Sequence, residues 1–405
     1  MPANGSRREV CELVLKRRTI LTGGGLALLA LSAGTVVGRS GWRNGAAPNA
    51  DVPPGELLRQ ANSWAYQLQN YDFRRLAASD ADVMVVDYSI SGDDSSRLSA
   101  STIRRLQKKA DGSRRLVLAY LSIGEAEEYR FYWKPEWIEA APAASEAAEA
   151  GKGGGGRADA AAPRAEQSDS TGRPMARSGK PADMPSSTAP ATADKPARRH
   201  SPTAPTWLGD ENEAWSGNFA VHYEQPEWQA IFLDGPGSYL ARIVEAGFDG
   251  VYLDRVDAFY DHPAHIADAD GQMIRFVAAI AAKGRQLKPG FLVVPQNAEE
   301  LLLRPGYADL IDAIAKEDLY YGSPDHGLAN SKGQIANSLG WLGIAKRKGR
   351  PVLVVEYLDD AEKIAEARAE LERNGFVATF APRLLDELSA FAAAPPRETT
   401  PPQTR

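Results

Sequence analysis

The sequence predicts a (β/α)8 TIM barrel, an α/β fold in which eight parallel strands alternate with helices. Eight short apolar runs are distributed along the chain, and they are nearly continuous rather than alternating between apolar and polar residues. Such runs are typical of parallel strands that are covered on both faces. Segments with helical spacing lie between them, which is the order expected for repeated strand–helix units. The predicted strands are residues 64–68, 83–88, 116–123, 250–254, 291–295, 310–316, 352–357 and 376–380.

Two segments show the helical pattern most clearly. Apolar residues between 273 and 280 follow the spacing i, i+3, i+4 and i+7, which places them on one buried face. Residues 364–371 repeat this pattern, and Gly375 is placed to end that helix. A doubly wound open sheet is the alternative fold. Its nucleotide-binding form lacks support, because no Gly-x-Gly-x-x-Gly turn follows the first predicted strand.

The composition excludes several classes of protein. The 405 residues contain a single cysteine, Cys11, so a disulfide-stabilised scaffold is excluded. The 53 Asp and Glu residues outnumber the 47 Lys and Arg residues, and the resulting net charge of −6 argues against a nucleic-acid partner, which would require a basic face. Five histidines leave little material for a metal cluster, so we expect no metal and no other cofactor.

The first 45 residues resemble an export signal. Lys16, Arg17 and Arg18 precede an apolar stretch at 26–37, which is shorter than the roughly 20 residues needed to span a bilayer. A basic segment before a short apolar one is typical of a signal peptide, and the arginine pair indicates the twin-arginine route. We therefore expect a periplasmic or extracellular protein. The alternative is an uncleaved N-terminal anchor, because no Ala-x-Ala cleavage site follows the apolar stretch. Such an anchor is the one membrane contact that we consider.

One domain is predicted for residues 46–394, with an insertion in it. Residues 139–205 are rich in Ala, Gly, Pro and Ser, and such a segment cannot bury enough apolar area to offset the entropy lost on ordering. The segment follows the third predicted strand and is flanked by Trp137 and Trp207, so we interpret it as a disordered insertion in one loop. Residues 395–405 are predicted to form a disordered tail.

The expected active site lies where the strands end. Catalytic groups of such barrels project from the C-terminal ends of the strands and from the loops that follow. Here acidic or amide side chains follow nearly every predicted strand. A carboxylate pair on one rim is typical of a glycosidase, which needs one protonated carboxyl as acid and one ionised carboxylate as nucleophile or base. Aromatic faces stack on sugar rings, and the candidates for this role are Trp133, Trp137, Trp207, Trp215 and Trp228.

Four strings carry a resemblance to a known family. They are Trp-Ala-Tyr-Gln-Leu-Gln at 64–69, Val-Asp-Tyr-Ser at 86–89, Ala-Tyr-Leu-Ser-Ile-Gly-Glu-Ala-Glu at 119–127 and Gly-Phe-Asp-Gly-Val-Tyr-Leu-Asp at 247–254. Through these strings the chain resembles glycoside hydrolase family 114, the endo-α-1,4-polygalactosaminidase-like TIM barrels. The resemblance does not include the insertion. The resemblance implies hydrolysis of α-1,4-linked galactosamine polymers, which are exopolysaccharides of biofilm matrix.

The resemblance also implies a catalytic pair, because the family's proposed carboxylates follow the fourth and sixth strands. These positions correspond to Asp254 and Glu317. We favour Glu317 as acid/base and Asp254 as nucleophile, and expect a separation of about 5–5.5 Å in a retaining enzyme or about 6.5–9.5 Å in an inverting one. Glu125 or Glu356 is the alternative partner of Asp254. The residues expected to bind the sugar are Asp87, Tyr88, Ser122, Glu125, Arg130, Tyr252, Asp257, Asn297 and Glu356.

Two functions other than an exported glycosidase are possible on the same predicted barrel. A non-catalytic carbohydrate-binding protein would keep the same groove without the chemistry, but the intact acidic rim argues against it. A metal-dependent hydrolase or deacetylase on the same barrel is disfavoured, because histidine is nearly absent from the predicted strand ends. For the exported glycosidase and for the non-catalytic carbohydrate-binding protein alike, we expect a polysaccharide as the partner.

The export signal can be tested with a fusion protein. Replacing Arg17 and Arg18 by Lys should stop export of a folded reporter that carries residues 1–50, because the twin-arginine route reads the arginine pair. Export is measured by the distribution of the reporter between periplasmic and cytoplasmic fractions. Unchanged export would instead indicate the general secretory route or an anchor.

Overall fold

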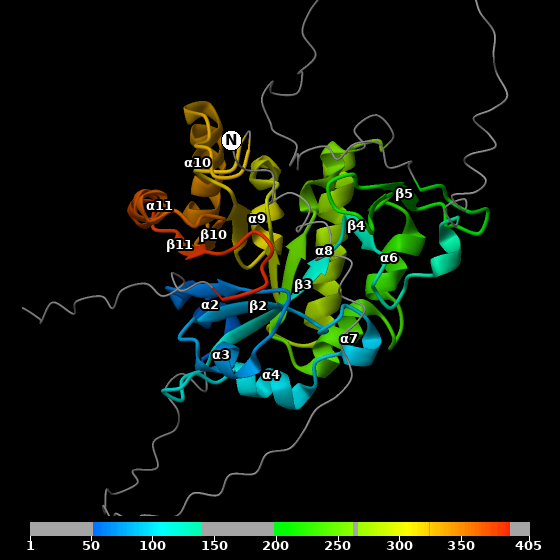
Figure 1. Ribbon diagram of the computed structural model, residues 1–405, viewed down its shortest axis with the longest axis horizontal. Helices are drawn as coiled ribbons and strands as arrows, with labels where there is room; N and C mark the ends of the chain where they lie inside the picture. Colours follow the sequence, from blue (N-terminus) through cyan, green and yellow to red (C-terminus); the bar gives the residue numbers. More distant parts are fainter. Residues whose placement is uncertain (1–51, 140–197, 262–265, 324, 389–405) are drawn as a thin grey trace, which may run out of the picture.

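The computed structural model describes residues 52–139, 198–261, 266–323 and 325–388. Within these ranges eight parallel strands are surrounded by helices, so the predicted (β/α)8 barrel is confirmed (Figure 1). The predicted signal at 1–45, the predicted tail at 395–405 and residues 140–197 of the predicted insertion lie outside the described residues. No helix in the described part of the chain is long and apolar enough to cross a membrane.

The eight strands form two hydrogen-bonded sets that close into one barrel. The orders are β1-β2-β3-β7-β8 and β9-β10-β11. The sets meet at a parallel bridge between Gln296 and Ala315, and again where the Trp64 indole donates to the Val377 carbonyl at 2.9 Å. The strands are β1 (Trp64–Tyr66), β2 (Val83–Asp87), β3 (Leu116–Ser122), β7 (Gly250–Asp254), β8 (Leu292–Pro295), β9 (Ile314–Glu317), β10 (Val352–Glu356) and β11 (Val377–Phe380).

All eight predicted strands are present; half of their ends coincide with the prediction, and all but one of the others differ by one or two residues. The sixth differs most, since it was expected to begin at residue 310 and begins at Ile314. The first residues of that apolar run belong to a short helix, α9 (Tyr307–Leu310), whose Tyr307 and Ala308 are buried. Burial alone could not separate the helix from the strand, because both contribute apolar residues to the core.

Helices occupy the connections between the strands. The two helical patterns in the sequence correspond to α8 and α11, and every residue predicted for their buried faces is buried. Gly375 has a φ of 64° directly after the end of α11, so it ends that helix as predicted. Together with α9, the helices are α2 (Pro54–Gln60), α3 (Phe73–Ala78), α4 (Ala100–Leu106), α6 (Pro226–Leu233), α7 (Tyr239–Ala246), α8 (Ala269–Leu287), α10 (Lys332–Arg347) and α11 (Ala361–Arg373).

The barrel interior is filled by side chains that point inward from alternate strand positions. Trp64, Tyr66 and Tyr252 stack there, with ring centroids 5.0 to 6.0 Å apart. Helix α2, which precedes β1, adds Leu57 and Leu58 to the same apolar cluster. The interior is therefore apolar and aromatic up to the level at which the C-terminal rim begins.

A small antiparallel sheet lies in the loop that follows β3. Its strands are β4 (Glu125–Glu127), β5 (Leu208–Glu211) and β6 (Asn218–Val221), in the order β4-β6-β5. This rim sheet lies above the ends of the barrel strands in Figure 1. The sequence analysis did not predict it, because its strands are three or four residues long and are separated in sequence by the insertion.

The two ends of the predicted insertion are held together. Ile138 and His200 form an antiparallel bridge, and the Glu139 backbone N–H donates to the Arg199 carbonyl at 2.9 Å. Residues 198–205 therefore have defined contacts, and the insertion ends earlier than the predicted boundary at 205. Composition could not show this, because backbone groups make these contacts.

Gly124, in the loop after β3, is closely approached by the loop after β7. A Cβ atom at this position would lie 2.2 Å from the Arg255 carbonyl oxygen and 2.4 Å from the Ala258 Cβ atom. Arg255 directly follows Asp254, the last residue of β7. The missing side chain at position 124 thus allows these two strand-end loops to meet.

Replacing Gly124 by Ala should lower the free energy of unfolding by about 1–3 kcal/mol, because the backbone on one side must shift. Gly340→Ala in α10 is the matched control, since no atom lies within 4 Å of its added Cβ. Alanine favours a helix over glycine, so the control should stabilise the protein by up to about 1 kcal/mol. Urea unfolding measures both changes, and equal stability of Gly124→Ala and the unchanged protein would contradict the close approach.

Candidate active site

Three neighbouring strands bring polar side chains to the C-terminal rim. Asp254 ends β7, Gln296 directly follows β8 and Glu317 ends β9. Because strand side chains alternate, each of them continues the row of residues that faces the barrel interior. The interior residues two positions earlier are Tyr252, Val294 and Ala315. The rim above the apolar interior is therefore polar at three adjacent strands.

Asp254 accepts hydrogen bonds from groups on both sides. The Tyr120 hydroxyl of β3 donates to its Oδ2 at 2.7 Å, and the Gln296 amide donates to its Oδ1 at 3.1 Å. The backbone N–H of Arg255 also donates to Oδ1, at 2.8 Å. These three donors fix the orientation of the carboxyl group.

Glu317 is held in the same manner. The Asn297 amide donates to its Oε1 at 2.8 Å, and the Tyr357 hydroxyl, after β10, donates to its Oε2 at 3.0 Å. The Asn297 Oδ1 accepts from the backbone N–H of Glu317 at 3.3 Å. Gln296 and Asn297 are consecutive, so the end of β8 connects the two carboxylates that the sequence analysis selected.

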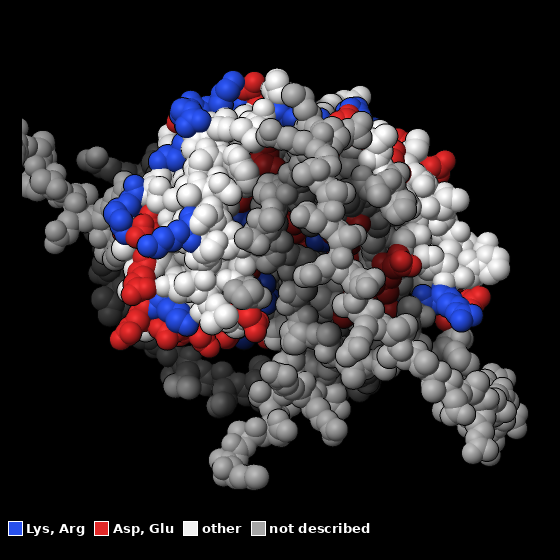
Figure 2. Space-filling model, turned by 90° about the horizontal axis from the view of Figure 1, so that it is seen from above, with Lys and Arg blue, Asp and Glu red and all other residues white. Residues whose placement is uncertain are grey.

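No cation of the described residues is in salt-bridge contact with this pair. Within the described ranges, neither Asp254 nor Glu317 forms a salt bridge, and no group of three or more His, Cys, Asp or Glu is arranged to hold a metal ion. Acidic side chains are visible in the middle of the face drawn in Figure 2. The neighbouring cations are bound by other acids, in the pairs Arg255–Glu125 at 3.1 Å, Arg383–Asp318 at 2.5 Å and Lys316–Glu299 at 3.6 Å.

Burial, followed by the negative charge of Glu317, raises the pKa of Asp254 to about 7. The Tyr120 hydroxyl acts in the opposite direction, because it donates to the ionised form of Asp254. The two carboxyl groups therefore interact electrostatically, and the pair retains a proton near neutral pH. A site with one protonated and one ionised carboxyl group can carry out acid–base and nucleophilic steps together.

The backbone leaves these three strands in left-handed conformations. Arg255, Asn297 and Asp318 have φ angles of 58°, 60° and 53°, and each directly follows one of the three inward-facing polar residues. Such conformations at non-glycine residues cost of order 1 kcal/mol or more and are concentrated at functional sites. Three of them on adjacent strand ends mark this part of the rim as the candidate active site.

Asp257 and Ser122 are predicted sugar-binding residues that lie beside the pair. Asp257 is in the 3-10 helix Val256–Tyr260, and its side chain is 30% exposed at 3.6 Å from Arg255. Burial raises its pKa and Arg255 opposes this, while Glu317 adds to the increase. Ser122 pairs with Asp254 in the β3–β7 register but is buried, and its hydroxyl donates to the Glu125 carbonyl at 3.3 Å. Asp257 can therefore meet a ligand, whereas Ser122 supports the site from behind.

The side chain of Glu125 is enclosed by other residues of the protein. The Asn212 amide donates to its Oε1 at 2.7 Å and the Asn218 amide to its Oε2 at 3.2 Å. The Arg255 guanidinium lies 3.1 Å from Oε1, and the residue is only 4% exposed. Glu125 thus connects the rim sheet to the residue after Asp254. Both of its oxygens already have partners within the protein, and its role as a sugar-binding residue stays a prediction.

Asp87, Tyr88 and Arg130, which are predicted to bind the sugar, form part of a buried cluster, and that role stays a prediction. The Arg130 guanidinium donates to both carboxylate oxygens of Asp87, at 2.9 and 2.8 Å, and to Glu127 at 2.6 Å. Tyr88 follows Asp87, faces away from the barrel interior and packs against Tyr239 with ring centroids 4.9 Å apart. A buried guanidinium needs acidic partners, and here they come from within the protein.

Glu356 and Tyr252, two further residues predicted to bind the sugar, are buried, and their sugar-binding role stays a prediction. Glu356 is fully buried and accepts hydrogen bonds from the backbone N–H groups of Tyr320 and Tyr321, at 2.8 and 3.2 Å. Burial raises its pKa to about 8. Tyr252 is fully buried in the barrel interior, beneath Asp254. Glu356 therefore anchors the loop after β9, and Tyr252 forms the floor of the site.

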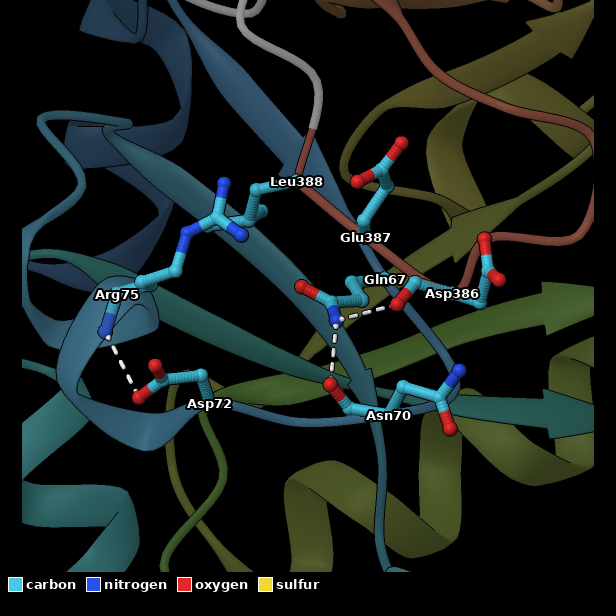
Figure 3. Close-up of a pocket in the computed structure, with 7 residues that line it drawn as sticks. All are labelled: Gln67, Asn70, Asp72, Arg75, Asp386, Glu387 and Leu388. Atoms are coloured by element: carbon cyan, nitrogen blue, oxygen red, sulfur yellow. Dashed lines mark hydrogen bonds between the residues drawn. The ribbon is translucent and has the colours of Figure 1, made fainter.

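The end of β1 holds the C-terminal segment instead of contributing to the carboxylate pair. The Gln67 amide donates to the carbonyls of Gln69 and Asp386, at 2.8 and 3.2 Å. Beside it is a small pocket that contains neither Asp254 nor Glu317 (Figure 3). Its lining residues are Gln67, Asn70, Asp72, Arg75, Asp386, Glu387 and Leu388.

The sequence analysis assigned no role to three side chains that hold the pair. Gln296 and Tyr357 lie at predicted strand ends, so their position alone made them candidates. Tyr120 lies inside β3, but it occupies the inward-facing position two residues before Ser122. Strand alternation was the signal that could have identified it.

The chain is similar to a known family and to proteins of other organisms. The family model described as glycoside-hydrolase family GH114 matches residues 190–394. An uncharacterised protein of Methanocaldococcus jannaschii is 31% identical over 316 residues, which are 76% of this chain and 70% of that protein. An uncharacterised protein of Thermotoga maritima is 28% identical over 353 residues, or 83% of this chain and 86% of that protein.

Two solved structures are also similar to this chain. The glycoside hydrolase domain of PelA from Pseudomonas aeruginosa has a TM-score of 0.48 and 20% identity, over 82% of this chain and 98% of that one. Aspergillus fumigatus Ega3, solved in complex with galactosamine, has a TM-score of 0.49 and 17% identity, over 81% of this chain and 95% of that one.

Replacing Tyr120 by Phe should raise the pKa of Asp254 above its value of about 7, by about one unit, because the ionised carboxylate loses a hydrogen-bond donor. Carbon-detected NMR of the Asp254 carboxyl during a pH titration measures the change. Tyr88→Phe is the matched control, since it removes a buried hydroxyl that has no hydrogen-bond partner. An unchanged titration in Tyr120→Phe would show that this hydrogen bond does not act on Asp254.

Proposed function

Because the chain belongs to glycoside hydrolase family GH114, we propose that it hydrolyses an α-1,4-linked galactosamine polymer with Asp254 and Glu317 as its catalytic carboxylates. The observation that carries the proposal is the connection of these two side chains through Gln296 and Asn297 at adjacent strand ends. Both face the open end of the barrel, both are oriented by hydrogen bonds, and neither has a salt-bridge partner in the described part of the protein.

The proposed reaction is a double displacement with retention of configuration. Glu317 donates its proton to the glycosidic oxygen as the bond to the anomeric carbon breaks, while the Asp254 carboxylate forms a bond to that carbon. Glu317 then takes a proton from a water molecule, which attacks the anomeric carbon and releases Asp254. Three donors hold Asp254. These hydrogen bonds fix the orientation of the Asp254 carboxyl group, which supports the assignment of Asp254 as nucleophile and of Glu317 as acid/base.

The charge of the site supports a substrate with free amino groups. The neighbouring cations are already paired with Glu125, Glu299 and Asp318, so the Asp254–Glu317 pair keeps its negative charge. Asp257 adds a partly exposed carboxylate beside it. An ammonium group on the sugar would be attracted to this site, whereas an acetylated amine would not. We therefore infer that the deacetylated polymer is hydrolysed faster than the acetylated one.

We also infer that the reaction takes place outside the cytoplasm. The support for this is the sequence pattern of residues 1–45, with its arginine pair and short apolar stretch. The proposed substrate, a galactosamine polymer, would be degraded in the periplasm or outside the cell. Export by the twin-arginine route is therefore part of the proposal, and the reporter fusion with residues 1–50 is its test.

Incubation with deacetylated and with acetylated polygalactosamine, followed by measurement of new reducing ends, tests activity and substrate together. Asp254→Asn and Glu317→Gln should each lower kcat/KM by about 10²–10⁴-fold, because each removes a reacting group at nearly constant shape. Asp309→Asn and Glu245→Gln, both on exposed side chains of outer helices, are the matched controls and should keep full activity. No reducing ends with either polymer, or full activity in both site variants, would contradict the proposal.

The configuration of the first product tests the assignment of roles. Proton NMR during hydrolysis should show the α-anomer first, because two successive inversions restore the original configuration. A β-anomer as first product would exclude Asp254 as nucleophile and would make it the base of an inverting enzyme. With an aryl glycoside whose leaving group needs no protonation, Glu317→Gln should still form the glycosyl-enzyme, whereas Asp254→Asn should not.

A further inference from the structure

Trp215 differs in its surroundings from the other four tryptophans that follow the third predicted strand. Trp137, Trp207 and Trp228 are at most 8% exposed, and Trp133 stacks on Phe219 with ring centroids 4.8 Å apart. These four therefore pack the loop against the barrel. Trp215 is 40% exposed, at the turn between β5 and β6. It is the one member of the group whose aromatic face is open to a ligand.

The turn that carries Trp215 is held by several hydrogen bonds. The Trp215 backbone N–H donates to the Asn212 carbonyl at 3.1 Å, and its carbonyl accepts from the Asn218 N–H at 3.0 Å. The Glu211 carboxylate accepts from the backbone N–H of Gly217 at 2.8 Å and from the Ser216 hydroxyl at 3.0 Å. An exposed ring on such a turn is presented in a fixed place, so it loses little freedom when a ligand stacks on it.

The same turn is tied to the catalytic pair. Asn212 and Asn218, on either side of Trp215, both donate to Glu125. Glu125 in turn contacts Arg255, which directly follows Asp254. The position of Trp215 is therefore set relative to Asp254 by this chain of contacts and by the hydrogen bonds of the rim sheet.

The charges near the turn fit the substrate of the proposed function. Asp210 and Glu213 are exposed, and neither forms a salt bridge among the described residues. Carboxylates beside an exposed indole ring suit a sugar with an ammonium group, which is attracted both to the acids and to the face of the ring. Asp210 and Glu213 therefore provide the charge complementarity, and Trp215 provides the apolar surface.

We propose that Trp215 is a stacking platform for a sugar unit of the polymer that lies beyond the units bound at Asp254 and Glu317. The proposal rests on the proposed function and adds to it a binding position outside the reacting centre. On this proposal a long polymer contacts the rim turn while it is bound at the pair, and a short oligomer bound at the pair does not. Trp215 thus determines the preference of the enzyme for long chains over short ones.

The test compares a long deacetylated polymer with a short oligomer of the same sugar. Trp215→Ala should raise KM for the polymer by about three- to tenfold without changing kcat, and should leave kcat/KM for the oligomer unchanged. Trp215→Phe keeps an aromatic ring and should restore most of the loss. Ile90→Ala is the control, because it removes another exposed apolar side chain, 53% exposed, from a strand-end loop and should change neither value.

A second measurement separates binding from chemistry. In the Glu317→Gln background, affinity electrophoresis in gels that contain the polymer should show weaker retardation of the variant that also carries Trp215→Ala. An enzyme that hydrolyses the polymer equally well with and without Trp215 would overturn the stacking platform and leave the proposed function intact. A protein that neither hydrolyses nor binds the polymer would overturn both. An equal loss on polymer and oligomer would assign Trp215 a structural role and also overturn the proposal.

Discussion

Asp254 and Glu317, two carboxylates that form no salt bridge with the described residues, lie directly above an apolar barrel interior, and the side chains of the rim around them follow from this arrangement. Burial without a counter-charge makes ionisation costly, and this explains the raised pKa of Asp254. A cation in contact would remove the proton that the pair needs. The donors to Asp254 and Glu317 are instead neutral hydroxyl and amide groups, from Tyr120, Gln296, Asn297 and Tyr357, together with one backbone N–H. Neutral donors orient the carboxylates without neutralising them.

The guanidinium groups of the rim stabilise its architecture. Arg130 is buried between Asp87 and Glu127, and this holds the loop after β3 against the end of β2. Arg255 contacts Glu125 and so connects β7 to the rim sheet. Removal of one partner from such a buried pair is strongly destabilising, at about 3–5 kcal/mol. The acidic residues of the rim therefore fall into two groups, those that bind cations and hold the loops, and those, Asp254 and Glu317, that form no salt bridge among the described residues and are the proposed catalytic pair.

The sequence predicted the strands well, because buried parallel strands are apolar throughout and need no long-range information. It also selected Asp254 and Glu317, since both follow such strands. It could not distinguish the acids that are free from the acids that are paired. Asp87 and Glu356 end or follow strands just as Asp254 does, but their partners, Arg130 and the backbone of Tyr320 and Tyr321, are distant in sequence. The rim sheet was missed for the same reason, because β4 pairs with β6 across the insertion.

The bridge between Ile138 and His200 closes the chain where it leaves and re-enters the rim loop. The two points are held beside each other in an antiparallel neck, so the number of residues between them does not affect the geometry of the strands. The entropy cost of closing a longer loop grows only with the logarithm of its length. Such a neck is therefore a position at which a further domain can be inserted into the enzyme, by evolution or by protein engineering, without a change in the structure of the rim.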